Sequence, residues 1–333
     1  LLSKISGTLR TAKLPSEVFS QKHRVIKVRI GKAISVAEQN EYESLDDYSE
    51  FLRKKTYMLA NPFEKGSKLI PTPTLKLSKS PKEIVTPANQ NKIIAEVDAL
   101  RESDCRLLQS KNYEVFFTNA SKIPNVLHEL VREGTNESID LDKFDQYYHH
   151  MFLWDDDAKK VAGAYRMGLG SEIYPKYGMH GFYLNDLFRF EPELHDMMSK
   201  SIEMGRAFII KEYQQKPMPL FLLWKGIIHT TLRYPEHKFL LGGVSISNQF
   251  SDFSKSLMIE FMKSNYYDPY IAQYIHPKKE YKVKLKDADK DFVFNETEAD
   301  LNKFDKVIDE LEPGSLRLPV LIKKYIKQNA RVV

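Results

Sequence analysis

The sequence predicts an α/β protein in which helices flank a mixed β-sheet. The first indication is that short apolar segments typical of strands alternate along the chain with longer segments of helical periodicity. The second is a pair of strands at 149–154 and 160–168, joined by a charged turn. The third is a strand–helix–strand unit over 206–247. Hydrophobic residues make up 42% of the chain, which is enough for a substantial core.

A proline-rich segment at 61–90 divides the 333-residue chain. It holds five prolines and few aromatic residues, and because proline removes a backbone donor and fixes φ, we expect an extended linker. Before it, alternating apolar residues predict a strand at 24–34, and an amphipathic helix is expected at 44–59 with Ser44 as its N-cap. One strand cannot close a sheet. Residues 1–60 are therefore expected to be the end of something larger.

The longer domain predicted over 91–333 alternates helices with strands. Runs rich in β-branched and aromatic residues predict strands, and amphipathic segments of about a dozen residues predict helices. In chain order, we expect a helix at 91–109, a strand at 113–119, a helix at 122–133, the two strands at 149–154 and 160–168, an extended piece at 181–190, a helix at 191–202, a strand at 206–213, a helix at 218–233, a strand at 238–247 and a helix at 251–264.

Composition and motifs exclude several classes of protein. No apolar stretch approaches the ~18 residues of a membrane span, and no signal peptide is recognisable, although Leu1 indicates a fragment or a processed chain. The single cysteine, Cys105, excludes an internal disulfide and suits a reducing cytoplasm. The net charge of +5 permits contact with anionic lipid or an acidic carrier protein but does not indicate a nucleic-acid binder. No zinc spacing, Walker loop or dinucleotide fingerprint occurs, so no metal site is predicted.

The pair His150 and Asp155 has the spacing of the catalytic motif of glycerolipid acyltransferases. A catalytic His–Asp pair needs hydrogen-bond contact. On a strand at 149–154, a separation of five residues places the two side chains on opposite faces and roughly 16 Å apart. A helix would also turn the second side chain away from the first. We therefore interpret this segment as a hairpin with a polar edge rather than as an active site.

Several segments between 140 and 247 occur together in a known family. In chain order they are "DLDKFD", "HHMFLWDDDAKKVAGAYRMG", "GFYLNDLFRF", "EMGRAFIIKEY", "FLLWKGI" and "FLLGGVSIS". Over roughly 95–333 the chain resembles the acyl-carrier-dependent N-acyltransferases of the GNAT superfamily that make ornithine or glycine lipids, proteins often labelled hemolysins. Their cousins are the homoserine-lactone autoinducer synthases. The resemblance implies a GNAT-like mixed β-sheet with splayed central parallel strands flanked by helices.

Both ends of the chain also resemble parts of known domains. The segment "AKLPSEVFSQKHRVIKVRIGKAIS" resembles the tail of a glycerolipid acyltransferase domain, so 1–60 is expected to be a small α/β remnant of such a domain. The catalytic motif of that domain would lie upstream of Leu1, and this chain is not expected to perform O-acylation alone. At the other end, "LRLPVLIKKYIKQNARVV" resembles the last helix of the N-acyltransferases and the beginning of a strand, which implies truncation at the C-terminus.

Aminolysis of a thioester needs a slot for the pantetheine arm, donors for the carbonyl oxygen and an acceptor for the amine's proton. The resemblance implies that the strands at 206–213 and 238–247 run parallel and then splay, so that the arm lies between them. Backbone N–H groups near 207–210 are expected to hold the oxyanion. The slot is predicted to be formed by Ala207, Phe208, Ile209, Gly242, Gly243 and Ser245, with the glycines permitting close approach. On the residues alone, an ordinary buried strand pair explains the same apolar pattern.

Charged residues near this slot are candidates for catalysis and acceptor binding. Glu203 and Arg206, in "EMGR", match an acid and an arginine of the family. Glu203 is predicted to be the base or an amine-positioning residue, and Arg206 to hold it or an acceptor carboxylate. A structural salt bridge at a helix–strand junction explains the pair equally well. The residues predicted to bind the amino-acid acceptor are Asp142, Asp145, Arg166 and Arg132.

The loop at 214–220, "QQKPMPL", bears on the acyl donor. It contains no glycine and two prolines, unlike the backbone N–H cradle that holds the pyrophosphate of coenzyme A. The expected donor is therefore the acyl-phosphopantetheine of acyl carrier protein, with acyl-CoA as the alternative, and no bound cofactor is expected. Basic residues predicted to contact the acidic carrier are Lys216, Lys225, Arg233 and Lys238. Isolated lysines are more often solvated surface.

The predicted function is transfer of a long-chain fatty acyl group from acyl carrier protein to the amine of an amino acid in aminolipid biosynthesis. A homoserine-lactone synthase would need a tryptophan region that is missing before Asp142, and an acetyltransferase using coenzyme A would need the glycine loop. A membrane-active, hemolysin-like protein is a further alternative, although 318–328 is short for a lytic helix. Its lysines instead suit contact with anionic lipid, so we expect a cytoplasmic protein, peripheral on the inner face of the membrane.

Overall fold

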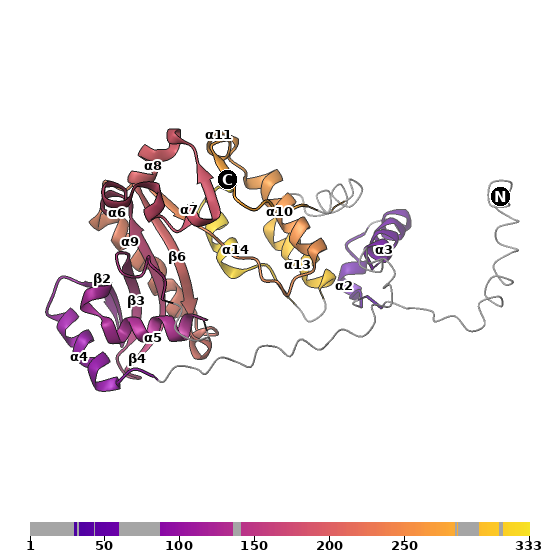
Figure 1. Cartoon of the computed structure of the whole chain (residues 1–333). Helices are drawn as coiled ribbons and strands as arrows, with labels where there is room; N and C mark the ends of the chain where they lie inside the picture. Colours follow the sequence, from indigo (N-terminus) through magenta and orange to yellow (C-terminus); the bar gives the residue numbers. More distant parts are fainter. Residues whose placement is uncertain are drawn as a thin grey trace, which may run out of the picture. The chain divides into compact units, whose positions relative to one another are not determined.

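The computed structural model describes most of the chain and divides it into two compact units. The described residues are 30–31, 33–42, 44–59, 87–135, 141–283, 285, 300–312 and 316–333. One unit comprises 1–67 with 302–317, and the other comprises 68–301 with 318–333 (Figure 1). Of the linker expected at 61–90, residues 61–86 lie outside the described residues, and residues 302–317 group with the N-terminal ones.

The described part of the first unit is helical. Its helices are α2 Val36–Gln39, α3 Leu45–Leu59 and most of α13 Leu301–Leu311. The Ser44 hydroxyl accepts a hydrogen bond from the Asp47 N–H at 3.1 Å, which confirms Ser44 as the N-cap of α3. Lys55 forms an ion pair with Glu310, which ties α3 to α13. Of the strand expected at 24–34, residues 24–29 and 32 lie outside the described residues, and the others form no strand.

The second unit contains a six-stranded mixed sheet in the order β1-β2-β3-β4-β6-β7. All neighbouring pairs are antiparallel except β6 and β7, which are parallel. This confirms the predicted α/β class and its mixed sheet. The strands of this sheet are β1 Arg106–Ser110, β2 Tyr113–Asn119, β3 His149–Asp155, β4 Lys160–Leu169, β6 Ser201–Ile209 and β7 Phe239–Gly242.

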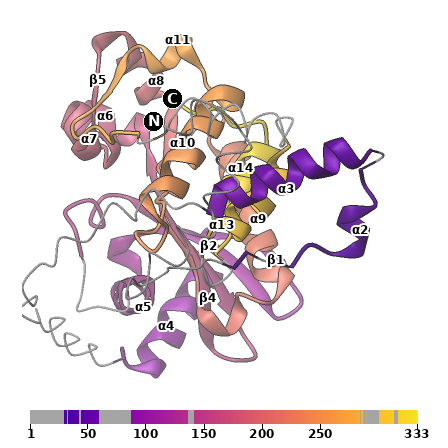
Figure 2. The same ribbon diagram turned by 90° about the vertical axis from the view of Figure 1, so that its right-hand side faces the viewer.

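Helices cover both faces of this sheet (Figures 1 and 2). On one face, α4 Gln90–Arg101 and α5 Pro124–Thr135 bury Val97, Val126 and their neighbours against the aromatic side chains of β2 and β3. On the other face, α9 Pro217–Arg233 buries Leu222, Leu223 and Ile227 against alternate residues of the same strands. The alternation of side chains along each strand therefore fills two separate core layers.

A third core cluster lies beside the β6–β7 end of the sheet. It is formed by residues of the 144–148 turn together with α6 Gly170–Tyr177, α7 Leu184–Leu187 and α8 His195–Ser199. A two-stranded antiparallel sheet, β5 Phe188–Phe190 with β8 Ile275–Pro277, adds to it. The remaining elements of this unit include α10 Asp252–Tyr266, α11 Pro269–Ala272 and α14 Val320–Lys327.

Several predicted elements have different bounds in the structure. The helix expected at 91–109 ends at Arg101, because the apolar residues after it form β1 and pair with β2. The strand expected at 206–213 begins at Ser201 and ends at Ile209. The strand expected at 238–247 ends at Gly242, where glycines replace side chains that would pack. The helix expected at 191–202 is also wrong in extent, since α8 stops at Ser199 and β6 follows.

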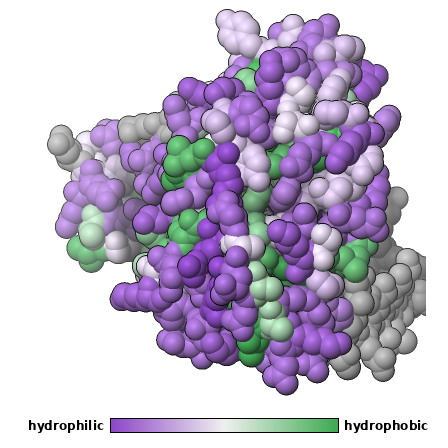
Figure 3. All heavy atoms as spheres, turned by 90° about the vertical axis from the view of Figure 1, so that its left-hand side faces the viewer, coloured by the Kyte–Doolittle hydropathy of each residue, from purple (hydrophilic) through white to green (hydrophobic). Residues whose placement is uncertain are grey.

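Figure 3 shows a face on which hydrophilic residues predominate and hydrophobic ones form small separate groups. Among the helices of the described residues, none has the length and apolar character needed to cross a bilayer.

Candidate active site

The sheet divides between β6 and β7. The two strands pair in parallel from Ser201 with Phe239 as far as Met204 with Gly242. Beyond that point β6 continues to Ile209, still paired with β4, while β7 ends. A Cβ atom at Gly242 would lie 2.9 Å from the Met204 carbonyl oxygen, so only glycine fits at this last pair. The parallel pairing therefore ends after Met204, and among the described strands only β4 pairs with β6 beyond it; we call this unpaired edge of β6, at 205–209, the opening between β6 and β7.

A β-bulge marks the same place on the other edge of β6. Arg166 of β4 lies opposite Gly205, and Ala164 lies opposite Phe208, so two residues of β6, Arg206 and Ala207, oppose one residue of β4. Arg206 has a φ of 45°, in the left-handed region that side chains other than glycine rarely occupy. Such a conformation costs on the order of 1–3 kcal/mol, so the surrounding contacts of Arg206 must hold it.

Backbone groups at the end of β6 alternate between β4 and the opening. The Ile210 N–H donates to the Ala162 carbonyl at 3.1 Å, so it faces β4 and cannot serve as an oxyanion donor as expected. Because antiparallel pairing alternates, the polar groups of Ile209 point the other way. In agreement, the Ile209 carbonyl accepts a hydrogen bond from the Gln214 side chain at 2.9 Å. The Ile209 N–H is thus directed into the opening beside β6.

Next to the bulge, two arginines and two aspartates form one ion-pair cluster. Arg166 Nη1 donates to Asp142 Oδ1 at 2.7 Å and to Asp145 Oδ1 at 2.8 Å. Arg206 Nη2 donates to Asp142 Oδ2 at 3.1 Å and lies 3.8 Å from Asp145 Oδ2 through Nη1. Three of the four residues predicted to bind the acceptor therefore meet here, together with Arg206.

The cluster has a buried half and an accessible half. The side chains of Arg166 and Asp145 are 3% and 1% exposed, whereas those of Asp142 and Arg206 are 25% and 26% exposed. Burial favours a higher pKa for the Asp142 carboxyl, but its hydrogen bond and charge interaction with Arg166, and the charge of Arg206, hold that pKa below its usual value. Burial favours a lower pKa for Arg166, yet its two carboxylate partners raise that pKa. Asp142 and Arg166 are thus expected to stay ionised near neutral pH.

Aromatic rings surround the buried arginine. The Arg166 guanidinium carbon lies 5.2 Å from the ring centroid of Tyr148 and 5.6 Å from those of Phe144 and Tyr183. These distances fit cation–π contact. The rings fix the Arg166 side chain and separate it from water, which strengthens its ion pairs.

Glu203 lies in β6 one residue before the opening and is almost fully buried. Its carboxylate accepts hydrogen bonds from the Tyr148 hydroxyl, from the Tyr183 N–H at 3.0 Å and from the Leu184 N–H at 2.6 Å. Burial raises the pKa of Glu203, and these hydrogen bonds offset only part of that effect. The carboxylate thus fastens the start of α7 to β6. The expected junction with Arg206 is not observed, because Arg206 pairs with the aspartates while Glu203 faces α7.

His150 is buried beside this cluster. Its Nε2 lies 3.0 Å from the Asp145 carbonyl oxygen, so this nitrogen is the donor, and burial lowers the pKa of the imidazole. A small cavity of about 20 Å³ opens here between α5 and the sheet. Its lining combines apolar side chains of α5 with polar groups of the cluster, namely Leu127, Leu130, Val131, Asp145, His150, Ala164, Tyr165, Arg166, Arg206 and Phe208.

The pair His150 and Asp155 is confirmed as separate. Asp155 accepts hydrogen bonds from the Tyr213 hydroxyl at 2.7 Å and from the Asn112 side chain at 2.6 Å, at the far end of β3. These donors, with the Asp157 and Ala158 N–H groups, hold the turn between β3 and β4. Asp155 thus has a structural role in the hairpin.

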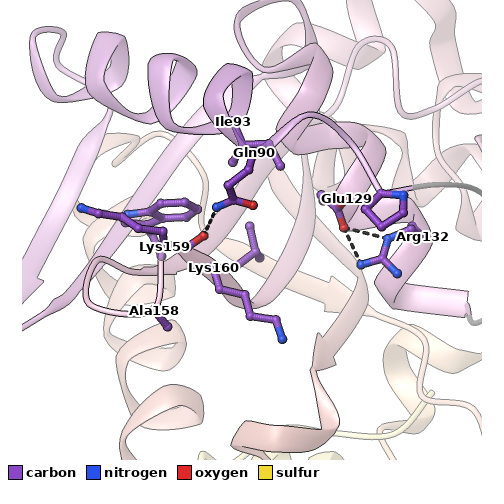
Figure 4. Close-up of a pocket in the computed structure, with 10 residues that line it drawn as sticks. Gln90, Ile93, Glu129, Arg132, Ala158, Lys159 and Lys160 are labelled. Carbon is purple, nitrogen blue, oxygen red and sulfur yellow. Dashed lines mark hydrogen bonds and ion pairs between the residues drawn. The ribbon is translucent and has the colours of Figure 1, made fainter.

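The structure does not bring Arg132 to the Asp142 cluster. Arg132 pairs with Glu129 at 2.7 Å on α5 and lines a larger cavity of about 310 Å³, which shares no lining residue with the small one (Figure 4). In the same cavity, the Gln90 side chain donates to the Lys159 carbonyl. Lys159 and Lys160 form ion pairs with Asp156 at 2.6 Å and Glu212 at 2.8 Å. The acceptor-binding prediction for Arg132 therefore lacks geometric support.

The four basic residues predicted to contact a carrier do not form one surface. Lys216 precedes α9, and Arg233 ends it, about 25 Å away along the helix axis. Lys238 precedes β7, at the paired end of the strands, while Lys216 follows β6 at the open end. Lys225 lies on the exposed side of α9 above the Phe221 ring. Only Lys216 is thus near the end at which the strands part.

The residues predicted for the donor slot fall on both sides of the opening. Ala207, Phe208 and Ile209 form the part of β6 beyond the last parallel pair. Gly242 ends β7, and Gly243 and Ser245 follow it in exposed positions. Phe208 also packs against both core layers, which anchors this end of β6.

Sequence reasoning missed Tyr148 and Tyr183. Both line the buried arginine, and both donate hydrogen bonds that reach the Glu203 carboxylate, Tyr148 from its hydroxyl and Tyr183 from its N–H. The motif "GFYLNDLFRF" contained Tyr183, but a run of aromatic residues is ordinarily core and gave no sign of this role.

Residues 126–224 match the Acetyltransferase (GNAT) domain family. This range contains Asp142, Asp145, Arg166, Glu203 and Arg206, and the sheet order and parting strands described above are consistent with a GNAT fold.

Two curated relatives are glycine N(alpha)-acyltransferases. The one from Bacteroides thetaiotaomicron is 25% identical over an alignment covering 56% of this chain and 61% of the relative. The one from Phocaeicola vulgatus is 24% identical over 56% of this chain and 63% of the relative. The chain thus spans about three fifths of the length of the curated relatives it matches. Together with the GNAT match, these similarities support an N-acyltransferase.

Proposed function

We propose that this chain transfers an acyl group from a thioester to the amine of an amino acid. The observation that carries the proposal is the parting of β6 from β7 beside the bulge at Arg206. A pantetheine arm in this opening would pair with the free edge of β6, where the Ile209 N–H is directed, much as an added strand does. The amine nitrogen attacks the thioester carbonyl carbon, so that a C–N bond forms and the C–S bond breaks. The ammonium group of the acceptor first gives one proton to water, and the thiolate that leaves takes up the second proton, which the nitrogen loses as the amide forms.

The accessible half of the ion-pair cluster suits a zwitterionic acceptor. Asp142 and Arg206 present opposite charges 3.1 Å apart, both about one quarter exposed. The ammonium group of an amino acid would bind Asp142 and its carboxylate would bind Arg206. Because Arg206 belongs to the bulge of β6, its bond to the carboxylate would hold the acceptor next to the strand along which the thioester arm is proposed to lie. The buried pair of Arg166 and Asp145 would keep the two docking groups in place.

The small cavity favours an acceptor with little or no side chain. Its volume of about 20 Å³ is close to the space that a single water molecule needs. Both relatives are named for glycine, which has no side chain. We therefore propose glycine as the first acceptor to test.

The N-terminus of α9 favours acyl carrier protein over coenzyme A as donor. The helix begins at Pro217, and Pro219 follows two residues later, so of its first three positions only Met218 has an N–H. A pyrophosphate would find few backbone donors there. With Lys216 beside the open end of the strands, an acidic carrier carrying a long acyl chain is the better fit. An amino acid N-acylated with a long chain is an aminolipid, so the proposed reaction belongs to aminolipid biosynthesis. We propose that it takes place in the cytoplasm, where an acyl carrier protein would supply the donor.

Glu203 is proposed to act as a positioning residue rather than as the base. Its carboxylate already accepts from Tyr148, Tyr183 and Leu184, and those contacts hold Tyr183 above Arg166. Loss of this carboxylate would displace the wall of the acceptor site without removing any charge that faces the substrate.

The proposal is tested by incubating the protein with long-chain acyl carrier protein and single amino acids, followed by mass spectrometry. The expected product is N-acylglycine, with less product from larger amino acids. Arg206→Gln is expected to lower the rate at least tenfold, because a charge-assisted hydrogen bond to the acceptor carboxylate is worth about 1.5–3 kcal/mol. The matched control, Arg189→Gln, removes an exposed arginine paired with Glu191 and should leave the rate unchanged. Equal rates in Arg206→Gln and the control would refute this site.

A further inference from the structure

The outer face of α9 carries large apolar side chains at one helical spacing. Met218, Phe221, Ile228 and Leu232 are 37%, 53%, 56% and 72% exposed, and Lys225 lies between them. With Lys225 included, these residues follow one another at intervals of three or four positions and form one narrow stripe along the helix. The stripe lies on the side of α9 opposite Leu223 and Ile227, which pack on the sheet. An exposed stripe of this kind on a helix indicates a surface for interaction.

The helix α14 extends this surface. The Tyr325 ring packs against the Trp224 ring of α9, with centroids 5.3 Å apart, so the two helices lie side by side (Figure 2). Val320, Lys324 and Lys327 are exposed and lie at positions i, i+4 and i+7 of α14, on one face of that helix. We define the α9–α14 surface as the α9 stripe together with these three residues.

The charge of this surface is of one sign. Neither 217–233 nor 316–333 contains an aspartate or a glutamate. Within the described part of the chain, Lys225, Lys324 and Lys327 form no ion pair with an acidic side chain. An amphipathic surface with cations at its margin and no acidic residues is complementary to anionic lipid, which offers negative headgroups above an apolar layer.

A second copy of this chain fits the surface less well. In a symmetric dimer, the same patch meets itself, which would bring the lysines of α9 and α14 of one copy against those of the other. No acidic residue on either helix could neutralise them. The long stripe, in which four large apolar side chains accompany one lysine, is more apolar than the surface that an acidic carrier would need, and α9 itself lies between the stripe and the sheet.

We propose that the α9–α14 surface binds an anionic membrane, with Phe221, Ile228 and Leu232 inserted among the lipids. The inference does not depend on the proposed reaction, because it rests on exposed side chains outside the β6–β7 opening. It would place the protein at the bilayer where a long-chain product is released.

The test is co-sedimentation of the full chain with vesicles of phosphatidylcholine, with and without phosphatidylglycerol. Binding is expected only to the anionic vesicles. Lys225→Glu should weaken it about fivefold or more, and Ile228→Ser should weaken it severalfold. Two matched controls lie elsewhere on the surface, Lys176→Glu and Leu187→Ser, both at exposed positions, and they should bind as the unmodified chain does.

Two results would overturn the inference. One is absence of binding to anionic vesicles, and the other is equal binding by the four variants. In the first case, a dimer in light scattering, or a complex with acyl carrier protein, that Ile228→Ser or Lys225→Glu abolishes would assign the surface to that partner instead. Because all four positions are exposed, the variants are expected to fold, and circular dichroism checks this independently of binding.

Discussion

Replacing Asp142 by asparagine probes the accessible half of the ion-pair cluster. Asparagine keeps an oxygen that can accept from one arginine but removes the charge that neutralises Arg166 and Arg206, whose nitrogens lie 2.7 Å and 3.1 Å from the carboxylate. Arg166 retains Asp145, and Asp142 is one quarter exposed, so we expect a loss of about 1–2 kcal/mol in the free energy of unfolding. This is below the roughly 3–5 kcal/mol for a fully buried pair.

The effect on activity is expected to be larger and confined to the acceptor. Losing a charge-assisted hydrogen bond to the ammonium group should lower kcat/KM for glycine by about 10- to 150-fold. The KM for the acyl donor should change little, because Asp142 lies on the acceptor side of the bulge. The assay is initial rate against glycine concentration at saturating donor. Asp186→Asn is the matched control, since Asp186 is an exposed carboxylate paired with Lys143 at 3.3 Å. Unchanged kcat/KM for glycine in folded Asp142→Asn would refute the assignment.

Three further predictions follow from the same geometry. Gly242→Ala should lower the free energy of unfolding by about 1–3 kcal/mol, measured with denaturant, and should also lower the initial rate of product formation. Gly243→Ala is the control, and it should be tolerated because its Cβ would lie 3.5 Å from Leu184. The raised pKa of Glu203 means that its contribution to stability is full below its ordinary pKa of about 4.3 and is lost as pH rises through the folded value. Above about pH 4.5, the unfolding midpoint of Glu203→Gln should therefore fall less steeply with rising pH than that of the unmodified chain. Equal dependence of the midpoint on pH in the two proteins would contradict this. Lys216→Glu should raise KM for acyl carrier protein about tenfold at low salt without changing KM for acyl-pantetheine, and an equal change for both donors would exclude a docking role.

Strands with uniform apolar runs were predictable from the sequence. The segments at 113–119, 149–155 and 160–169 lie between helices on both faces of the sheet, so the middle of each is mainly apolar or aromatic and does not have the pattern of an amphipathic helix. The extent of β6 was not predictable in this way. Charged residues such as Glu203 and Arg206 more often precede a buried strand than lie within it. Glu203 lies within β6 because Tyr148 and the start of α7, which are distant in sequence, donate hydrogen bonds to its carboxylate.

The candidate site was predictable in composition but not in pairing. Asp142, Asp145 and Arg166 were expected to converge, and the register of β3 with β4 and the turn before β3 bring them together. Spacing alone could not exclude Arg132, because only the orientation of α5 turns it towards Glu129 and the larger cavity. Nor could it reveal that Arg206 pairs with Asp142, since the bulge and the left-handed φ that redirect this side chain have no local sequence signal.

The proposed reaction requires the acyl thioester arm to lie in the opening between β6 and β7. Hydrogen–deuterium exchange with a non-hydrolysable acyl-pantetheine amide measures whether it does. We expect slower exchange confined to the backbone amides of 205–209, above all that of Ile209, because the arm would pair with the free edge of β6. Binding of the compound with no slowing at these amides, or with slowing around Gln90 and Lys159 instead, would contradict it.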